Sequence, residues 1–273
     1  GSAKLGIYHY GGDSLQGRYY LHRLHPLSVA ELGIESQSEL ENLLELNGFP
    51  EPFFSNSKLE QQRWSRQYRS LLVREEIRDL EQVTELGLLE HLALRLPELV
   101  ASPLSLNSLR QDLQVAHKTV AKWCEILERL YYIFRLFPFG APSIRAIKKT
   151  PKHYHFDWGL LSKPGPRFEN FVACHLLKWV HHLQDCEGRD IELRYFRDTD
   201  KREVDFVILE QQVPTHAIEC KIQSKGIDPN LKYFKAKFPK TRAIQIELNN
   251  KRSYKSEESI EVVSALEFLR FLV

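Results

Sequence analysis

Two neighbouring segments with the pattern of β-strands carry the side chains best suited to chemistry in this chain. Asp205 lies in the apolar segment Glu203–Leu209, and Glu219 and Lys221 lie two residues apart near the end of His216–Ile222. Because side chains alternate along a strand, Glu219 and Lys221 are expected on one face. Carboxylates that converge from adjacent strands can hold Mg²⁺ or Mn²⁺ through oxygen ligands. A lysine beside them can orient a water or offset the charge of a phosphate, so these residues predict metal-dependent phosphodiester hydrolysis.

An aspartate followed by an acid-x-lysine triplet is the arrangement of metal-dependent nucleases. Glu219-Cys220-Lys221 is the one such triplet in the sequence, and it follows Asp205 by a single predicted hairpin. Asp205 and Glu219 are the expected metal ligands, and Glu169, near the start of the preceding helix, is a candidate third acid. The spacing alone leaves a second interpretation open, in which the polar face of an amphipathic hairpin is only solvated.

The segments around these strands predict a mixed α/β unit over residues 163–273. Pro164-Gly165-Pro166 marks its start, and a long amphipathic helix follows through Leu183. Three strands, a helix, a strand and a closing helix are then expected in the following order: Glu192–Arg197, Glu203–Leu209, His216–Ile222, Leu231–Phe238, Arg242–Leu248 and Ser264–Leu272. The order α-β-β-β-α-β-α suits a mixed sheet flanked by helices.

Residues 104–162 predict a winged helix. A short helix capped by Asn107 or Ser108 is followed by a turn and by a second helix with an apolar stripe, and the segments Tyr131–Leu136 and Lys152–Phe156 predict two strands. Lys118, Thr119 and Lys122 lie off that stripe or at its edge, where they could reach solvent. A winged helix that serves only for packing is the alternative.

The charge distribution favours contact with DNA, with RNA as a further possibility. The whole chain carries a formal charge of +2, yet the segment Leu104–Lys152 holds nine lysines and arginines against three acids. Basic side chains clustered in this way bind phosphate groups. The expected contacts are Lys118, Thr119, Lys122, Lys148, Lys149 and Lys152.

Composition excludes several other classes of protein. Of the 273 residues, 42% are apolar and 27% are charged, which is typical of a folded protein. The four cysteines form no CxxC pair, which argues against a zinc ribbon or a disulfide scaffold. No apolar run approaches the roughly 18–20 residues that cross a bilayer, and no signal peptide opens the sequence. We therefore expect a cytoplasmic protein without a membrane partner.

Motifs spread over nearly the full length of the sequence occur in the order of a known family. They are Gly1-Ser2-Ala3, Gly11-Gly12-Asp13-Ser14-Leu15-Gln16-Gly17-Arg18, His25-Pro26-Leu27-Ser28, Gly48-Phe49-Pro50-Glu51-Pro52, Lys118-Thr119-Val120, Asp157-Trp158-Gly159-Leu160-Leu161, Phe168-Glu169-Asn170-Phe171-Val172, Glu203-Val204-Asp205-Phe206 and Ile218-Glu219-Cys220-Lys221. Through these motifs the sequence resembles the C-terminal two-thirds of prokaryotic AAA-type ATPases that end in the domain of unknown function DUF4143.

The resemblance implies a fold and a function for each region. Residues 163–273 would form a PD-(D/E)xK restriction-endonuclease-like domain, with Glu169, Asp205, Glu219 and Lys221 at the active-site positions. Residues 35–103 would be a helical, lid-like region before the winged helix at 104–162. Residues 1–34 would be the remnant of an AAA ATPase core.

In that remnant, Ser2 would lie near a sensor strand and Arg18 would be an arginine-finger or sensor candidate. No GxxxxGK[ST] loop occurs in the sequence, and such a loop is what cradles nucleotide phosphates in these ATPases. No ATPase activity is therefore expected from this chain alone. ATP would be a cofactor only of the full-length relative, and the missing ATPase segment or other protomers would be partners.

Two classes of function stay open at this point. The first is a Mg²⁺- or Mn²⁺-dependent nuclease that the winged helix recruits to DNA. The second is a catalytically inactive, nuclease-like fold that serves the ATPase as a DNA-binding, protein-interaction or regulatory module.

Overall fold

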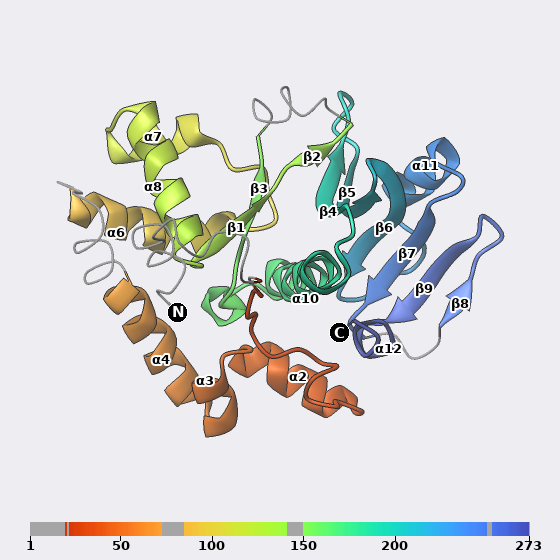
Figure 1. Ribbon diagram of the computed structural model, residues 1–273, viewed down its shortest axis with the longest axis horizontal. Helices are drawn as coiled ribbons and strands as arrows, with labels where there is room; N and C mark the ends of the chain where they lie inside the picture. The colour runs from red at the N-terminus through yellow and green to blue at the C-terminus, as the bar shows by residue number, and fades with distance from the viewer. Residues whose placement is uncertain (1–19, 21, 73–84, 141–149, 250–252, 273) are drawn as a thin grey trace.

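The computed structural model describes residues 20, 22–72, 85–140, 150–249 and 253–272 (Figure 1). Its helices, with two short 3-10 turns, are α2 (Gln37–Leu46), α3 (Pro50–Ser55), α4 (Lys58–Leu71), α6 (Leu86–Arg95), η3 (Leu96–Leu99), α7 (Leu106–Leu113), α8 (His117–Arg129), η4 (Trp158–Leu160), α10 (Pro164–Glu187), α11 (Pro229–Lys237) and α12 (Ala265–Leu269). Its strands are β1 (Ile133–Leu136), β2 (Pro138–Phe139), β3 (Lys152–His155), β4 (Ile191–Arg197), β5 (Glu203–Glu210), β6 (Val213–Lys221), β7 (Arg242–Glu247), β8 (Tyr254–Lys255) and β9 (Ile260–Ser264).

A seven-stranded mixed sheet forms the C-terminal part of the molecule, with the strand order β2-β4-β5-β6-β7-β9-β8. The consecutive strands β4, β5 and β6 are antiparallel, whereas β6, β7 and β9 run parallel. The parallel pair β6 and β7 is joined through α11, as a parallel connection requires. With the helices α2 to α8 N-terminal to it (Figure 1), this sheet confirms the mixed α/β class predicted from the sequence.

Helix α10 covers one face of this sheet. It begins at Pro164, where a missing backbone N–H costs nothing, and it ends before Gly188, whose φ of 66° allows the chain to leave the helix. Its apolar side chains are buried together with Phe206, Ile208 and Ile218 of β5 and β6. The opposite face of the sheet packs against α11 through a separate apolar cluster.

The elements α7, α8, β1 and β3 follow one another in the order predicted for a winged helix. β1 and β3 form an antiparallel pair in which Ile133 faces His155. The cap of α7 differs from the predicted Asn107 or Ser108, because the Ser105 side chain, two or three residues earlier, accepts a hydrogen bond from the backbone N–H of Ser108. A core of α6, α7, α8 and β1 side chains closes this unit.

The largest apolar cluster extends across the boundary expected at residue 163. It contains Phe134 of β1 and Tyr154 of β3 together with residues of α10 and the sheet. The rings of Tyr154 and Phe206 lie 5.7 Å apart between centroids. The strand β3 is therefore packed against the C-terminal sheet as well as against β1. None of the described helices is both long and apolar enough to cross a membrane.

Candidate acidic site

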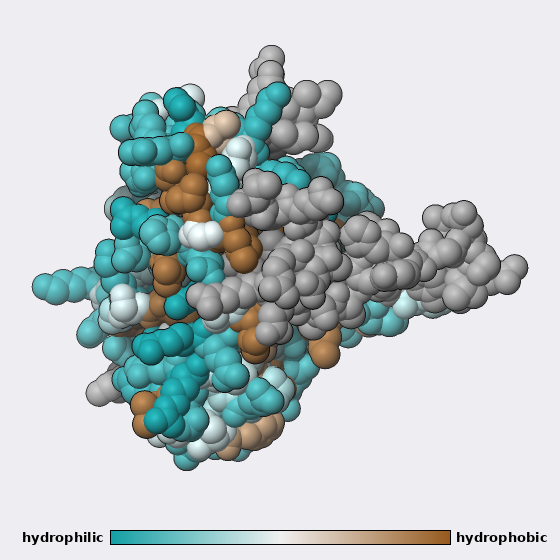
Figure 2. Space-filling model, turned by 90° about the vertical axis from the view of Figure 1, so that its left-hand side faces the viewer, coloured by the Kyte–Doolittle hydropathy of each residue, from teal (hydrophilic) through white to brown (hydrophobic). Residues whose placement is uncertain are grey.

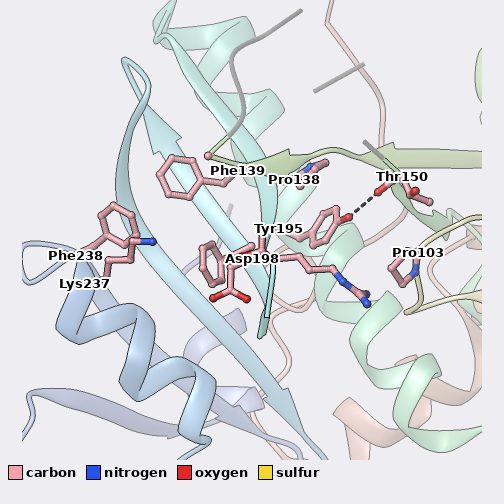
Figure 3. Close-up of a pocket in the computed structure, with 12 residues that line it drawn as sticks. Pro103, Pro138, Phe139, Thr150, Tyr195, Asp198, Lys237 and Phe238 are labelled. Atoms are coloured by element: carbon pink, nitrogen blue, oxygen red, sulfur yellow. Dashed lines mark hydrogen bonds between the residues drawn. The ribbon is translucent and has the colours of Figure 1, made fainter. Parts of the chain in front are cut away.

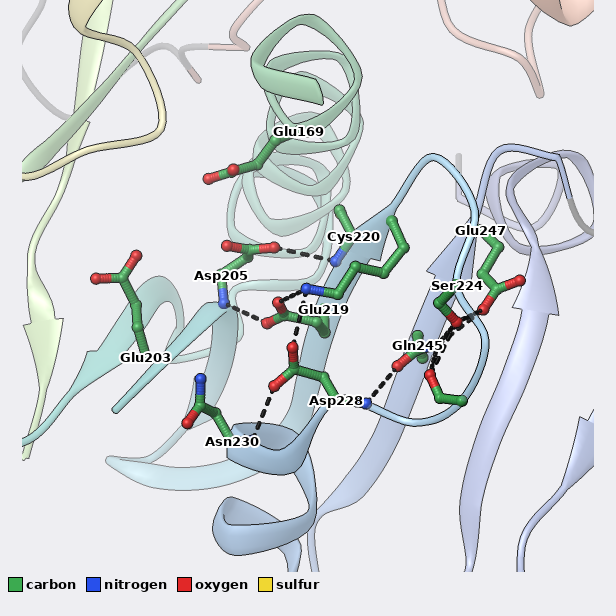
Figure 4. Close-up of polar contacts among 12 residues, drawn as sticks. Glu169, Glu203, Asp205, Glu219, Cys220, Ser224, Asp228, Asn230, Gln245 and Glu247 are labelled. Carbon is green, nitrogen blue, oxygen red and sulfur yellow. Dashed lines mark hydrogen bonds and ion pairs between the residues drawn. The ribbon is translucent and has the colours of Figure 1, made fainter. Parts of the chain in front are cut away.

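The predicted site residues gather where β5 begins and β6 ends (Figure 4). Phe206 of β5 faces Ile218 of β6, so the antiparallel register brings Asp205 next to Glu219. Glu169 comes from the first turns of α10, and Figure 4 shows Asp205 between Glu169 and Glu219. The sequence therefore identified residues that lie together in the fold.

Each oxygen of the two expected metal ligands already accepts a hydrogen bond. Asp205 Oδ2 accepts from the backbone N–H of Cys220 at 3.0 Å, and Asp205 Oδ1 accepts from Lys152 Nζ at 3.3 Å. Glu219 Oε1 accepts from Lys221 Nζ at 2.8 Å, and Glu219 Oε2 accepts from the backbone N–H of Asp205 at 3.3 Å. Both carboxylates are thus held by protein donors rather than open toward a shared ion.

Lys221 links two acids on the α11 side of this group. Its Nζ lies 2.8 Å from Glu219 Oε1 and 2.9 Å from Asp228 Oδ2. Burial opposes the charge on Lys221, but the two carboxylates outweigh burial and raise its pKa. Lys221 therefore stays an ammonium ion, which suits electrostatic stabilisation and does not suit a general base.

Lys152 was predicted to contact nucleic-acid phosphates, and the structure corrects this. Its side chain is 0% exposed, and its Nζ lies 2.7 Å from Glu203 Oε1, 3.1 Å from Glu169 Oε1 and 3.3 Å from Asp205 Oδ1. Burial disfavours the charged form, but Tyr154 and the carboxylates raise the pKa of Lys152 well above its ordinary value. An ammonium ion bound in this way has no access to an external phosphate.

Two carboxyl groups of the site have raised pKa values. Burial and the charge of Asp205 raise the pKa of Glu169 to about 7, although Lys152 and the Tyr154 hydroxyl favour its ionised form. The Tyr154 hydroxyl donates to Glu169 Oε1 at 2.7 Å. Burial and Asp205 also raise the pKa of Glu219 well above its ordinary value. Perturbed pKa values in a compact group of acids are typical of functional sites.

Sequence reasoning missed three polar residues of the site, namely Glu203, Tyr154 and Asp228. Asp228 caps α11 by accepting from the backbone N–H of Asn230 at 2.8 Å, and its own N–H donates to the buried Gln245 at 2.8 Å. Asp228 precedes a proline at the start of α11, a helix-start signal that could have placed it. No comparable signal marks Glu203 or Tyr154, because their partners are distant in sequence.

The arrangement does not fit a divalent metal ion. Mg²⁺ requires oxygen ligands at roughly 2.0–2.1 Å. The three carboxylate oxygens around Lys152 Nζ lie 2.7–3.3 Å from that nitrogen, so an ion at the position of the nitrogen would be too far from them. Within the part of the chain that the structure describes, no three His, Cys, Asp or Glu side chains form a group that could hold a metal ion. The acids as placed here do not form a ready ion site, and binding of the Mg²⁺ or Mn²⁺ predicted from the sequence stays a prediction.

The predicted nucleic-acid contacts on α8 do reach the surface. Lys118 and Lys122 are exposed and Thr119 is partly exposed. Arg135, which contributes to the basic excess of this region, pairs with Glu128 at 2.6 Å and is largely buried. Four further predicted residues lie outside the described part of the chain: Ser2, Arg18, Lys148 and Lys149.

Figure 2 shows the side of the molecule that faces left in Figure 1, where polar side chains surround an apolar band. A hollow of about 310 Å³ between α6 and α7 is lined in part by Leu94, Leu109 and Leu113. Leu94 is 51% exposed.

A larger hollow, of about 720 Å³, lies beside the acidic site (Figure 3). Aromatic rings of β2, β4 and the end of α11 line it, and Lys237 and Asp198 add charges. Tyr195 belongs to both places: its hydroxyl donates to the carbonyl oxygen of Thr150 at 2.6 Å, and its ring centre lies 5.7 Å from Lys152 Nζ.

Two family models match the chain. Residues 37–164 match Domain of unknown function (DUF8612), and residues 164–268 match Domain of unknown function (DUF4143). The second match confirms the resemblance to DUF4143 over the unit that holds α10 and the sheet. The AAA-type ATPase context stays a prediction. No curated protein and no solved structure matches the chain.

Proposed function

We propose that the chain is the effector region of a AAA-type ATP-binding protein and binds DNA through its winged helix. In this proposal the PD-(D/E)xK-like domain is a binding and regulatory module that does not cut phosphodiesters while its acids are paired as described above. The proposal favours the second of the two classes that the sequence leaves open.

The placement of Lys118 and Lys122 carries the DNA-binding part of the proposal. Both lie on the exposed side of α8, the second helix of the helix–turn–helix, while Val120 and Trp123 face the core. The second helix of such a motif is the one that enters the major groove. Lysines near its start can therefore contact backbone phosphates, which supply affinity and register rather than sequence selection.

The nuclease-like part rests on the order of elements and on the position of the acids. The order α10-β4-β5-β6-α11-β7 is the one predicted from the sequence for the mixed sheet of this unit, and it supports the nuclease-like fold that the resemblance implies. Asp205 lies on the second of these strands, and Glu219 and Lys221 lie on the third. The absence of cleavage is proposed because the oxygens of Asp205 and Glu219 all accept hydrogen bonds from the protein itself.

A Mg²⁺- or Mn²⁺-dependent nuclease is the second candidate. The proximity of Asp205, Glu219 and Lys221 favours it, because these are the residue types that the chemistry needs. Cleavage would require the pairs around Asp205 to rearrange, so that its oxygens become available to an ion.

A DNA-binding titration tests the winged-helix contacts. We expect the double variant Lys118→Ala and Lys122→Ala to bind duplex DNA more weakly in fluorescence anisotropy at low salt. The slope of log K against log salt should fall by up to about two, since each lost phosphate contact removes roughly 0.9. The matched control is Lys240→Ala with Lys255→Ala, which removes the same charge from exposed positions on the sheet unit. Equal losses of DNA affinity in both double variants would contradict DNA contact by α8. Tighter binding of the wild type to RNA than to duplex DNA would identify RNA as the partner.

A plasmid-nicking assay separates the two candidates. The wild-type chain should leave plasmid intact with Mg²⁺ or Mn²⁺, as in EDTA. Metal-dependent nicking that Glu219→Gln reduces at least about a hundredfold would instead establish the nuclease.

A further inference from the structure

Three carboxylate oxygens surround Lys152 Nζ, two of them as hydrogen-bond acceptors. An ammonium group has three N–H donors, and three carboxylate oxygens from three different side chains lie within 3.3 Å of this nitrogen. Figure 4 shows the carboxyl groups of Glu169, Glu203 and Asp205 turned toward one common space. The Lys152 side chain fills that space and is 0% exposed.

Several buried acids in this part of the molecule share one cation. Glu169, Glu203, Asp205 and Glu219 lie within a few side-chain lengths of one another, and Lys152 pairs with three of them. Removing a partner from a buried ion pair leaves an uncompensated charge, which proteins rarely tolerate. Arg197 also pairs with Glu203, at 2.9 Å, and Lys221 pairs with Glu219 and Asp228, so Lys152 is the cation that Glu169 and Asp205 share.

We propose that the ammonium group of Lys152 takes the place of the divalent cation that the acid pattern predicts from sequence. It pairs with the carboxylates of α10 and β5, and its Nζ occupies the space among Glu169, Glu203 and Asp205, so that Asp205 is held by an ammonium group instead of an ion. The chain therefore binds no Mg²⁺ or Mn²⁺ at this centre while Lys152 is in place. This inference rests on the nuclease-like domain of the proposed function and is independent of DNA contact by α8.

Lys152 and the acids that surround it come from different parts of the fold. Lys152 is the first residue of β3, which pairs with β1 of the winged helix, and it faces Leu136 in that register. The acids come from α10 and β5. The winged helix thus supplies the positive charge that neutralises the acids of the other unit, and the acidic centre stays closed as long as β3 keeps its place.

Mn²⁺ binding, followed by the electron paramagnetic resonance signal of the free ion, tests the proposal. We expect the full wild-type chain to leave the free Mn²⁺ signal as in buffer. Lys152→Met removes the charge at similar side-chain length, and it should bind Mn²⁺ at least about tenfold more tightly than the wild type. Adding Asp205→Asn to that variant should abolish the gain. The control Lys232→Met breaks the exposed pair of Lys232 with Glu258 and should behave as the wild type.

Two results would overturn the proposal. The first is Mn²⁺ binding by the wild type that Asp205→Asn removes. The second is a folded Lys152→Met chain that binds no better than the wild type. If Lys152→Met fails to fold alone, refolding with and without Mn²⁺ decides: recovery of the native circular dichroism with Mn²⁺ alone supports the proposal, and failure in both overturns it. DNA binding, measured on the same samples, reports separately on α8.

Discussion

His175 illustrates how burial selects the protonation state of a single residue. Its Nδ1 donates to the carbonyl oxygen of Phe171 at 2.8 Å, and its Nε2 accepts from the backbone N–H of Val29 at 3.1 Å. That pair of contacts requires the neutral ring with its proton on Nδ1. Burial accordingly lowers the pKa of His175 to about 4.

The pKa of His175 predicts a loss of stability in mild acid. The unfolded ring takes up a proton below about pH 6.5 and the folded ring does not, so this contribution to stability falls as pH falls toward 4. Between pH 8 and pH 5 the loss is about 2 kcal/mol. In urea unfolding, the destabilisation caused by His175→Gln should shrink by about that amount over the same range. Parallel pH profiles of the two chains would contradict this account.

Single residues also mark the limit of prediction from the sequence. The sequence predicted that Asp205, Glu219 and Lys221 lie close together. The alternation along each strand determines which side chains share a face, and it can be read from local patterning. Lys152 was assigned to a DNA surface because its sequence neighbours are basic. The three acids that bury it lie at positions 169, 203 and 205, and only the tertiary fold brings them near.

Among the elements, the 3-10 turn η4 and helices α2 and α4 meet at one buried carboxylate. Asp157 accepts hydrogen bonds from Asn47 Nδ2 at 2.8 Å, from the backbone N–H of Gly159 at 2.9 Å and from Ser65 Oγ at 2.5 Å. These donors come from the end of α2, from η4 and from α4. The side chain therefore joins three segments through hydrogen bonds, in addition to the apolar cluster that Trp158 shares with Leu40 and Leu43.

Replacing Asp157 tests how much this junction stabilises the molecule. Asp157→Asn exchanges one acceptor oxygen for a donor that faces other donors, so we expect a loss of about 1–3 kcal/mol in unfolding free energy. Glu98→Gln is the control, since its pair with Arg95 is exposed and worth at most about 1 kcal/mol. A variant at position 157 as stable as this control would refute the role given to the carboxylate.

The elements were predicted more reliably than their ends. The long apolar periodicity of α10, the apolar run of β5 and the alternation of β6 predicted those elements. Residues 204–209 of β5 are all buried, which places that strand inside the sheet. The strand expected from Tyr131 begins two residues later at Ile133, because Tyr131 has a φ of 56° and terminates α8 in a left-handed turn. The strand β9 went unpredicted because its five residues lie between a polar run and the helix capped by Ser264.

At the scale of the whole molecule, one apolar core joins the winged-helix strands to the sheet. Phe134 and Tyr154 are buried with α10 and with β5. We therefore expect the described regions to unfold in a single transition, with coincident curves from far-ultraviolet circular dichroism and from tryptophan fluorescence. Trp123 and Trp158 report from two different apolar clusters. Two separated transitions would show that the units are independent.

The position of β3 has a consequence for work with shortened versions of this protein. The two family matches meet at residue 164, which invites expression of the C-terminal segment alone. Such a fragment would keep Glu169, Glu203 and Asp205 but lose Lys152 and the ring of Tyr154 that covers Phe206. Its acids at positions 169 and 205 would lack their ammonium partner, and an apolar face would be newly exposed. Any affinity for metal ions, or any tendency to aggregate, measured on that fragment would result from the truncation and would not be a property of the whole chain.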